Sequence, residues 1–164
     1  MKISENVGKK INEQIGHEFN AKYLYLSMSA YFGGLNLSGF AKWMKNQADE
    51  EDNHAMKLFG YLGERNGKVE LGTLKAPQSD WKSPLDAFEA ALAHEQKVTE
   101  LIYGIVDAAK SEKDHATDAF LDWFVKEQVE EESSARAIVE RLKRLGDSRS
   151  GIYLLDKELG ERKD

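Results

Sequence analysis

The chain has 164 residues, a net charge of −6 and no cysteine. This length suits one domain with a substantial core, and the negative charge argues against nucleic acid as a partner. Without cysteine the chain cannot form disulfide scaffolds, thiol nucleophiles, zinc–thiolate sites or iron–sulfur clusters. No apolar signal run opens the sequence and no stretch reaches the roughly 18 apolar residues of a membrane span, so we expect a cytoplasmic protein that does not bind membranes.

The first part of the chain predicts two long helices joined by a short turn. Ser4 fits the N-cap of a helix that runs to about Phe32, where two glycines end it. Ser38 fits the cap of a second helix, which continues to about Arg65 before Asn66 and a glycine end it. Because the connection between them is short, the two helices are expected to form an antiparallel hairpin.

Residues 67–83 contain glycine and proline and show no helical pattern, and the pair Asp80 and Trp81 looks exposed. A loop of this length needs a reason in a compact domain. A helix of about 28 residues spans roughly 42 Å, and an extended chain of about 17 residues reaches roughly 55 Å. We therefore predict a crossover that returns along the bundle, with the short segment from Val69 to Leu71, apolar at both ends, lying against the helices.

The rest of the chain predicts a second hairpin and one short helix. Ser83 and Pro84 indicate the start of a helix to about Lys110, and a further helix covers about residues 115–145 before Gly146. Two hairpins joined by one long crossover form a four-helix bundle distinct from the simple up-down kind. We predict one all-α domain over residues 1–164, with the bundle at about 4–145. A short fifth helix at about 148–160 would need a partner surface, for which a subunit interface is the natural candidate.

Each long helix has one face that is apolar at both ends and polar in the middle. Steps of three and four residues, taken alternately, trace this face. Buried polar and charged groups are costly unless they are paired or bound to metal. Because the polar residues are central, antiparallel helices bring them to one level in the core. The four faces are Val7, Ile11, Gln14, Glu18, Ala21, Tyr25, Met28 and Phe32; Phe40, Met44, Gln47, Glu51, His54, Leu58 and Tyr61; Phe88, Leu92, Glu95, Thr99, Ile102, Val106 and Ala109; and Leu121, Phe124, Gln128, Glu131, Ala135, Ile138 and Leu142.

Four glutamates in this layer indicate a site for two divalent cations. Without cations the carboxylates would repel one another and their pKa values would rise, whereas two divalent ions balance four negative charges. One histidine among several carboxylates favours iron or manganese over zinc. The glutamates are Glu18, Glu51, Glu95 and Glu131, and His54 completes a Glu-x-x-His motif with Glu51 of the kind found in di-iron bundles.

The two cations are expected to have unlike ligands. The helix at 115–145 lacks the second Glu-x-x-His motif that a symmetrical di-iron centre would have. A weakly held second ion suits a metal that passes through the site rather than a retained cofactor. The expected ligands are Glu18, Glu51 and His54 for the first cation, and Glu51, Glu95 and either Gln128 or Glu131 for the second.

Further side chains are candidates beside this pair. Glu50, Glu127 and Glu130 form an acidic surplus that either holds a third cation or is a solvated face. Tyr25 is expected near the metals as a hydrogen-bond donor or one-electron donor, although a core tyrosine bonded to a carboxylate also explains it. Trp123 is either a more distant electron donor or a core residue. The remaining histidines lie off the inner faces and are assigned no ligand role.

At these residues the chain resembles the bacterial non-haem ferritins, members of the ferritin-like di-iron family. The resemblance runs nearly from end to end and also covers the last helix. The matching segments are His17-Glu18, the run Tyr-Leu-Tyr-Leu-Ser-Met at 23–28, the run at 47–56 with Glu50, Glu51 and His54, the pair His94-Glu95, the run at 120–132 with Glu127, Gln128, Glu130 and Glu131, and Leu-Asp-Lys-Glu-Leu at 155–159.

The resemblance implies a ferritin-like four-helix bundle that stores iron. It implies a ferroxidase, an enzyme that oxidises Fe(II) with O₂ or H₂O₂ at a di-iron centre inside each subunit. The ferric iron would be stored as a mineral inside a hollow homo-oligomeric shell of 24 subunits. In these terms Glu18, Glu51, His54, Glu95, Gln128 and Glu131 match the paired iron sites, Tyr25 joins them as a candidate catalytic residue, and Glu50, Glu127 and Glu130 match a third iron site.

Haem is not expected. Bacterioferritins carry a haem-ligating methionine where Asp52 stands here, and a second Glu-x-x-His where this chain has Gln128 and Glu131. Met44 and Met56 are therefore interpreted as bundle packing.

Three other functions use parts of the same pattern. A purely structural bundle would need no polar layer and would bind no metal. A di-iron oxygenase or peroxide-scavenging enzyme would use the layer but usually has a substrate cavity or an attached redox domain. A mini-ferritin that protects DNA commonly has a basic tail, whereas this chain ends in Gly-Glu-Arg-Lys-Asp.

Overall fold

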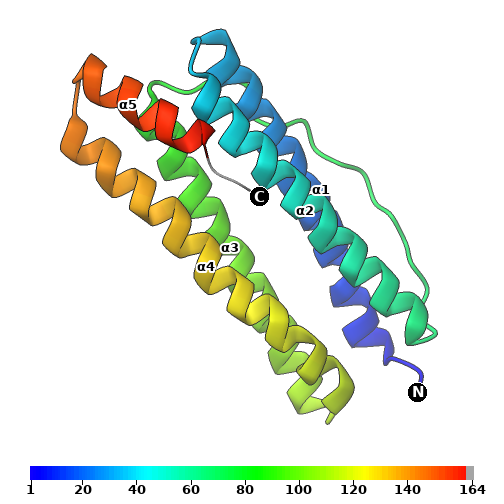
Figure 1. Cartoon of the computed structure of the whole chain (residues 1–164). Coiled ribbons are helices and arrows are strands. Elements are labelled where there is room, and N and C mark those ends of the chain that lie inside the picture. Colours follow the sequence, from blue (N-terminus) through cyan, green and yellow to red (C-terminus); the bar gives the residue numbers. More distant parts are fainter. Residues whose placement is uncertain (162–164) are drawn as a thin grey trace.

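A computed structural model describes residues 1–161, in which the regular structure consists of five helices. α1 and α2 pack as one antiparallel hairpin, α3 and α4 form another, and the two hairpins lie side by side (Figure 1). The predicted all-α bundle with a long crossover is thus confirmed. The helices are α1 (Glu5–Gly34), α2 (Ser38–Glu64), α3 (Pro84–Ser111), α4 (His115–Leu145) and α5 (Arg149–Gly160).

The helix starts follow the predicted caps with one exception. The hydroxyls of Ser4 and Ser83 each accept a hydrogen bond from the backbone amide three residues further on, at 3.2 and 3.1 Å. Ser38, by contrast, is the first residue of α2 and not its cap. Leu37 occupies the cap position, where its side chain cannot accept a hydrogen bond. The start of α2 therefore depends on another part of the chain.

α5 supplies the missing cap. Asp156 Oδ1 accepts a hydrogen bond from the Phe40 amide at 2.9 Å. The two backbones are in contact, since a Cβ added at Gly39 would lie 1.6 Å from the Asp156 carbonyl oxygen. Leu155 and Leu159 are buried in the adjoining apolar cluster. α5 thus packs against α2 of its own chain, at one end of the bundle (Figure 1), and a subunit interface at this helix stays a prediction.

The crossover between α2 and α3 runs along α1 without regular structure (Figure 1). Three side chains of α1 bind its backbone through hydrogen bonds of 2.6 to 2.9 Å. Asn12 binds the backbone of residues 68 and 70, Asn20 that of residue 75, and Ser27 that of residue 78. These three side chains lie about two helical turns apart on one face of α1, so the predicted return along a helix is confirmed.

Two side chains of the crossover differ from expectation. Trp81 looked exposed in the sequence but is only 6% exposed. Its ring lies edge-on to that of Tyr31, with centroids 5.3 Å apart, and covers the apolar cluster at this end of the bundle. In the apolar stretch 69–71, Val69 packs against the core as predicted, whereas Leu71 is 66% exposed.

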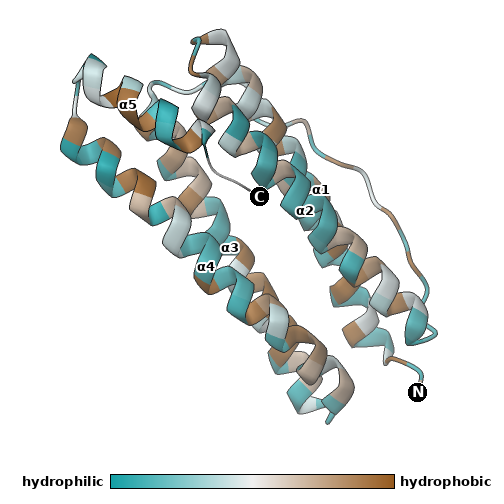
Figure 2. Cartoon of the chain, viewed as in Figure 1, coloured by the Kyte–Doolittle hydropathy of each residue, from teal (hydrophilic) through white to brown (hydrophobic). Residues whose placement is uncertain are grey.

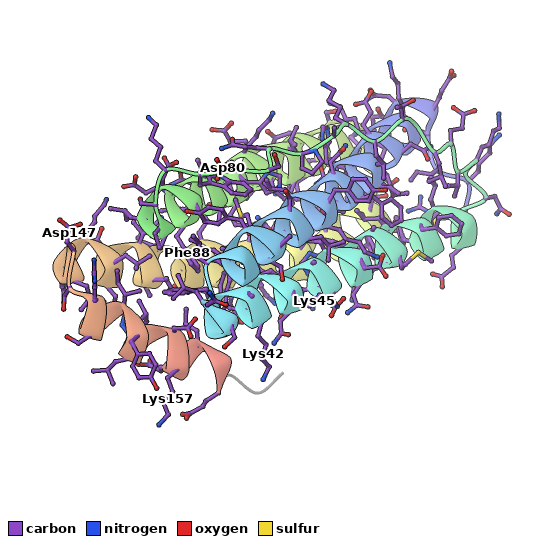
Figure 3. The ribbon with its side chains drawn as sticks, turned by 90° about the horizontal axis from the view of Figure 1, so that it is seen from above. Lys42, Lys45, Asp80, Phe88, Asp147 and Lys157 are labelled. Atoms are coloured by element: carbon purple, nitrogen blue, oxygen red, sulfur yellow. The ribbon has the colours of Figure 1, made fainter. Side chains whose placement is uncertain are left out.

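The predicted inner faces are buried throughout α1, α2 and α4. On α3, however, Leu92 and Val106 are half-buried, while Ala91 and Ile105 are buried in their place. The face of α3 therefore takes the three-residue step before the four-residue step, the reverse of the predicted order. Figure 3 shows Phe88 of this face between the helices, with lysines such as Lys45 pointing outward, and Figure 2 shows hydrophobic and hydrophilic residues interleaved along each helix.

Two apolar clusters fill the ends of the bundle, and a polar layer separates them. The first cluster includes Phe32, Phe40 and Phe88, and the second includes Ile11 and Leu58. None of the helices within residues 1–161 has the length and apolar character required to cross a bilayer. The buried polar side chains of the central layer are Gln14, Glu18, Gln47, Glu51, His54, Glu95, Thr99, Gln128 and Glu131.

Candidate metal centre

The polar layer lies between the two hairpins, midway along the bundle. No α-carbon of α2 comes within 8 Å of an α-carbon of α4. These two helices therefore meet here through long side chains, which span the gap. Gln47 Nε2 on α2 donates to Glu131 Oε2 on α4 at 2.7 Å, and the His54 ring lies edge-on to Trp123 with centroids 5.5 Å apart. A site at this level draws ligands from all four helices.

The half of the layer formed by α1 and α2 contains a compact group of ligands. A carboxylate oxygen of Glu18, one of Glu51 and a ring nitrogen of His54 all lie within 4.8 Å of one another. Glu51 Oε2 is 3.4 Å from His54 Nδ1, because residues three apart share a helix face. The side chain of Gln14, one turn before Glu18, donates to Glu18 Oε1 at 2.8 Å. Glu18 Oε2 and Glu51 Oε2 are buried and have no hydrogen-bond partner among residues 1–161. These two oxygens are suitably placed to bind a cation.

The half formed by α3 and α4 centres on Glu95. Tyr25 donates a short hydrogen bond from its hydroxyl to Glu95 Oε1. Gln128 Nε2 lies 3.3 Å from Glu95 Oε2 and 3.2 Å from the Glu95 carbonyl oxygen. Thr99, one turn after Glu95, donates to the same carbonyl at 3.0 Å. Both carboxylate oxygens of Glu95 therefore already have partners from the protein.

The site contains more carboxyl groups than can all be ionised while they are buried. Burial first, and then the charge of Glu51, raises the pKa of Glu18 well above its usual range. Burial and the charge of Glu95 do the same to the pKa of Glu51. Burial raises the pKa of Glu95 to about 7, and burial together with the charge of Glu95 raises that of Glu131 to about 8. Repulsion and desolvation of this kind are relieved when cations bind.

The three residues predicted for a third cation have different surroundings. A carboxylate oxygen of Glu127 lies within 4.8 Å of ligand atoms of His54 and Glu131. Glu50 is half-buried, and its charge is one of the causes that raise the pKa of Glu131. Glu130 is exposed and belongs to neither of the two ligand groups found within residues 1–161. The structure thus places Glu127 beside His54 and Glu131, and it leaves Glu130 at the surface.

Two interpretations of single residues need correction. Trp123 is 37% exposed, and Lys57 Nζ lies 3.9 Å from the centre of its ring, so it is not a core residue. It lies instead beside His54, at the edge of the polar layer. Met56, interpreted as bundle packing, is 50% exposed, whereas Met44 is fully buried as expected.

The sequence pattern predicts no role for the glutamine side chains that orient the buried glutamates. Gln14 and Gln47 were recognised only as polar members of the inner faces, yet they hold Glu18 and Glu131 respectively. A signal was present in the spacing, because each glutamine stands four residues before a glutamate on the same helix face. That rule finds the partner of Glu18 but not the cross-helix partner of Glu131.

Comparison with known proteins supports the assignment of the family. Residues 8–145 match the family model of the ferritin-like domain. The chain is 45% identical over 160 residues to a bacterial non-heme ferritin of Bacteroides fragilis, covering 98% of this chain and 99% of the relative. It is 39% identical over 160 residues to the bacterial non-heme ferritin of Staphylococcus aureus, covering 98% and 96%.

Solved structures show the same relationship. An open pore ferritin from the hyperthermophilic archaeon Archaeoglobus fulgidus superimposes with a TM-score of 0.98 at 48% identity, covering 99% of this chain and all of that one. A structure described as a humanized archaeal ferritin gives a TM-score of 0.97 at the same identity, covering 99% and 98%. The chain therefore belongs to the ferritin family, as its resemblance to the bacterial non-haem ferritins predicted.

Proposed function

We propose that this protein stores iron by oxidising Fe(II) in the polar layer and depositing the ferric product as a mineral inside a shell of 24 copies. The strongest support is the buried group of Glu18, Glu51 and His54, in which two carboxylate oxygens lack a hydrogen-bond partner among residues 1–161. Buried carboxylates in this state are strongly unfavourable unless a cation compensates them. Membership of the ferritin family supports iron as the cation.

Fe(II) enters this scheme as the substrate. The first ion is expected at Glu18, Glu51 and His54, whose ligand atoms already converge. Glu51 is the natural bridge to a second ion, because the charges of both Glu95 and Glu131 act on it. The two ions each give up one electron, either to O₂, which takes up two protons to form H₂O₂, or to H₂O₂, which takes up two protons to form two waters.

The side chains contribute orientation and control of protons. Tyr25 and Gln128 fix the two oxygens of Glu95, and Gln47 fixes Glu131. With pKa values of about 7 and 8, Glu95 and Glu131 hold protons for part of the time at neutral pH when no metal is present. Binding of cations displaces those protons. Because Glu95 must also give up hydrogen bonds to the protein, the second ion is expected to be the more weakly held.

The proposal extends to assembly and location. We expect a homo-oligomeric shell in the cytoplasm without haem, with the third cation position served mainly by Glu127. A solved relative is described as an open pore ferritin, and cryo-electron microscopy of this protein would allow a direct comparison with it. A particle other than a hollow shell of 24 subunits would contradict the expected assembly.

The decisive experiment mixes Fe(II) with the metal-free assembled protein in air. Ferric absorbance and light scattering would be followed together, so that oxidation and mineral growth are separated. Glu51→Ala and His54→Ala are expected to slow oxidation strongly while the shell stays intact. Glu13→Ala is the matched control, because Glu13 is an exposed glutamate on α1 outside the polar layer. Iron that oxidises no faster with the wild-type protein than in buffer would refute the proposal.

A further inference from the structure

A pocket lies on the side of the bundle, between α1, α3 and the crossover. Its volume is about 290 Å³. Pockets for drug-sized ligands are about 300–1,000 Å³, so this one suits a small ion or a terminal group of a larger molecule. Its polar and charged lining residues are His17, Asn20, Lys75, His94 and Lys97, and none of its lining residues is acidic.

The charge of this pocket contrasts with the rest of the molecule. The whole chain carries 29 acidic residues against 23 lysines and arginines, yet the pocket brings together two ammonium groups. Several lysines elsewhere are paired with a carboxylate, such as Lys22 with Asp52 at 2.7 Å. Lys75 and Lys97 form no salt bridge with any residue in 1–161. Two ammonium groups that lack acidic partners and share one concave surface attract an anion.

The histidines of the pocket lie in this positive field. Both His17 and His94 line the pocket beside the two lysines. The Nε2 atom of His94 is buried and has no hydrogen-bond partner within residues 1–161. A buried polar atom without a partner is unfavourable, and a bound ligand or water would relieve it.

The loop side of the pocket is held in place. Asn20 Oδ1 accepts a hydrogen bond from the Lys75 amide at 2.9 Å, and Asn20 Nδ2 donates to the Gly16 carbonyl at 2.9 Å. The side chain of Asn20 thus connects α1 to the crossover at the residue that carries one of the two ammonium groups. This bond fixes the backbone of Lys75, so less motion of the crossover must be frozen when a ligand binds.

We propose that Lys75, Lys97, His17 and His94 form a binding site for a phosphate-type oxyanion. The two lysines exclude a simple metal cation as the ligand, because neither has a carboxylate beside it to offset its charge. The ammonium groups supply charge and donors to the oxyanion, and the imidazoles supply further hydrogen-bonding nitrogens. The site opens on the side of the bundle and not into the polar layer, although the ring of His94 lies edge-on to that of Tyr25 with centroids 6.3 Å apart. The proposal does not depend on the proposed iron chemistry.

The test measures binding of inorganic phosphate to the metal-free, fully assembled protein by isothermal titration calorimetry. Metal must be absent, because phosphate also binds iron. We expect saturable binding of one phosphate per subunit, weakened roughly 10-fold or more by Lys97→Glu and by Lys75→Glu. Lys82→Glu is the matched control, since Lys82 is an exposed lysine of the same crossover outside the pocket; it should leave binding unchanged.

A second arm identifies the source of the oxyanion. ADP would be titrated under the same conditions, alone and in competition with phosphate. Tighter binding of ADP, lost in the Lys97→Glu variant, would assign the site to the terminal phosphate of a nucleotide; binding of phosphate alone would assign it to the free ion. Absence of saturable binding for both ligands, or equal binding by the wild type and both pocket variants, would overturn the proposal.

Discussion

The two halves of the polar layer hold their carboxylates in different ways. On the side of α1 and α2, Glu18 and Glu51 each have one buried oxygen without a hydrogen-bond partner among residues 1–161. On the side of α3 and α4, both oxygens of Glu95 accept hydrogen bonds, from Tyr25 and Gln128. One half thus has coordinating positions open, while in the other half the protein occupies them.

This difference predicts an order of filling. A cation that enters the α1–α2 half breaks few existing hydrogen bonds, and it relieves two unfavourable buried oxygens. A cation that enters the α3–α4 half must replace hydrogen bonds already formed by Glu95. Asymmetry of this kind favours a retained first ion and an exchangeable second one, which suits a protein that passes iron onward. Four changes to the chain or its conditions would break or sharpen this comparison.

The largest effect is expected on the metal-free protein as the pH rises. Glu95 and Glu131 have folded pKa values of about 7 and 8, against about 4.3 for an unfolded glutamate. The folded state therefore binds their protons more tightly, and this stabilisation is present below about pH 4 and lost as the pH rises through 7 and 8. We expect a loss of roughly 3 kcal/mol or more for each group.

The measurement is thermal unfolding of the chelator-treated protein between about pH 5 and about pH 8.5, a range that brackets both pKa values. Added Zn²⁺ or anaerobic Fe(II) should restore stability at the alkaline end. Glu131→Gln keeps the hydrogen bond from Gln47 but removes the charge, so it should flatten the pH dependence. An unfolding temperature that is level across the range would show that the acids are already compensated without metal.

The second effect compares the two halves directly. Glu18→Ala should slow the initial oxidation of Fe(II) roughly 100-fold, whereas Glu95→Ala should slow it roughly 10-fold. The reason is that Glu18 belongs to the group proposed to bind the first ion, while Glu95 is proposed to bind the second. Stopped-flow absorbance at low iron-to-protein ratio would measure both rates. The reverse order of the two variants would contradict the proposed order of filling.

A smaller effect is expected from Tyr25→Phe. Burial raises the pKa of Glu95, and the hydrogen bond from Tyr25 limits that rise. Loss of the hydroxyl should therefore move the pKa of Glu95 upward and shift binding of the second cation to higher pH. Oxidation should slow about threefold to 10-fold, mainly in the phase assigned to the second ion. A variant with an unchanged pH profile would leave Tyr25 as a core residue only.

The smallest effect lies outside the polar layer. Asp156→Ala removes the acceptor that caps α2 from α5, and it should cost about 1 kcal/mol of stability. Limited proteolysis should then release α5 more readily, since its link to the Phe40 amide is gone. The rate of Fe(II) oxidation should not change, because the metal ligands lie midway along the bundle. A large loss of activity would show that α5 influences the centre.

Periodicity explains why the sequence could predict that the candidate metal ligands share one layer. A glutamate in the middle of an otherwise apolar helix face contradicts simple burial, and the same contradiction recurs on four helices. The group of Glu18, Glu51 and His54 follows from this pattern alone, because spacing fixes the face and the hairpin fixes the level. The predicted role of each ligand still awaits the experiments above.

Other features depend on contacts between distant residues, which periodicity does not specify. The cap of α2 by Asp156 joins positions 116 residues apart, and the burial of Trp81 depends on where the crossover meets α1. The face of α3 could be traced in two ways, since Leu92 and Ala91 are both apolar and only packing against the neighbouring helices selects Ala91. The local sequence pattern therefore predicts the polar layer, whereas the contacts that hold the surrounding elements in place depend on tertiary packing.

The side chains of α1 that hold the crossover also mark a place where the chain could be extended. Asn12 and Asn20 form hydrogen bonds with the backbone on either side of the exposed residues 71–73. Neither side chain forms a hydrogen bond with residues 71–73 themselves. Extra residues inserted at Gly72 would lengthen a loop whose two ends stay anchored, and longer loops cost little additional entropy. Foreign peptides placed at this point would be displayed in every subunit while the helices keep their register.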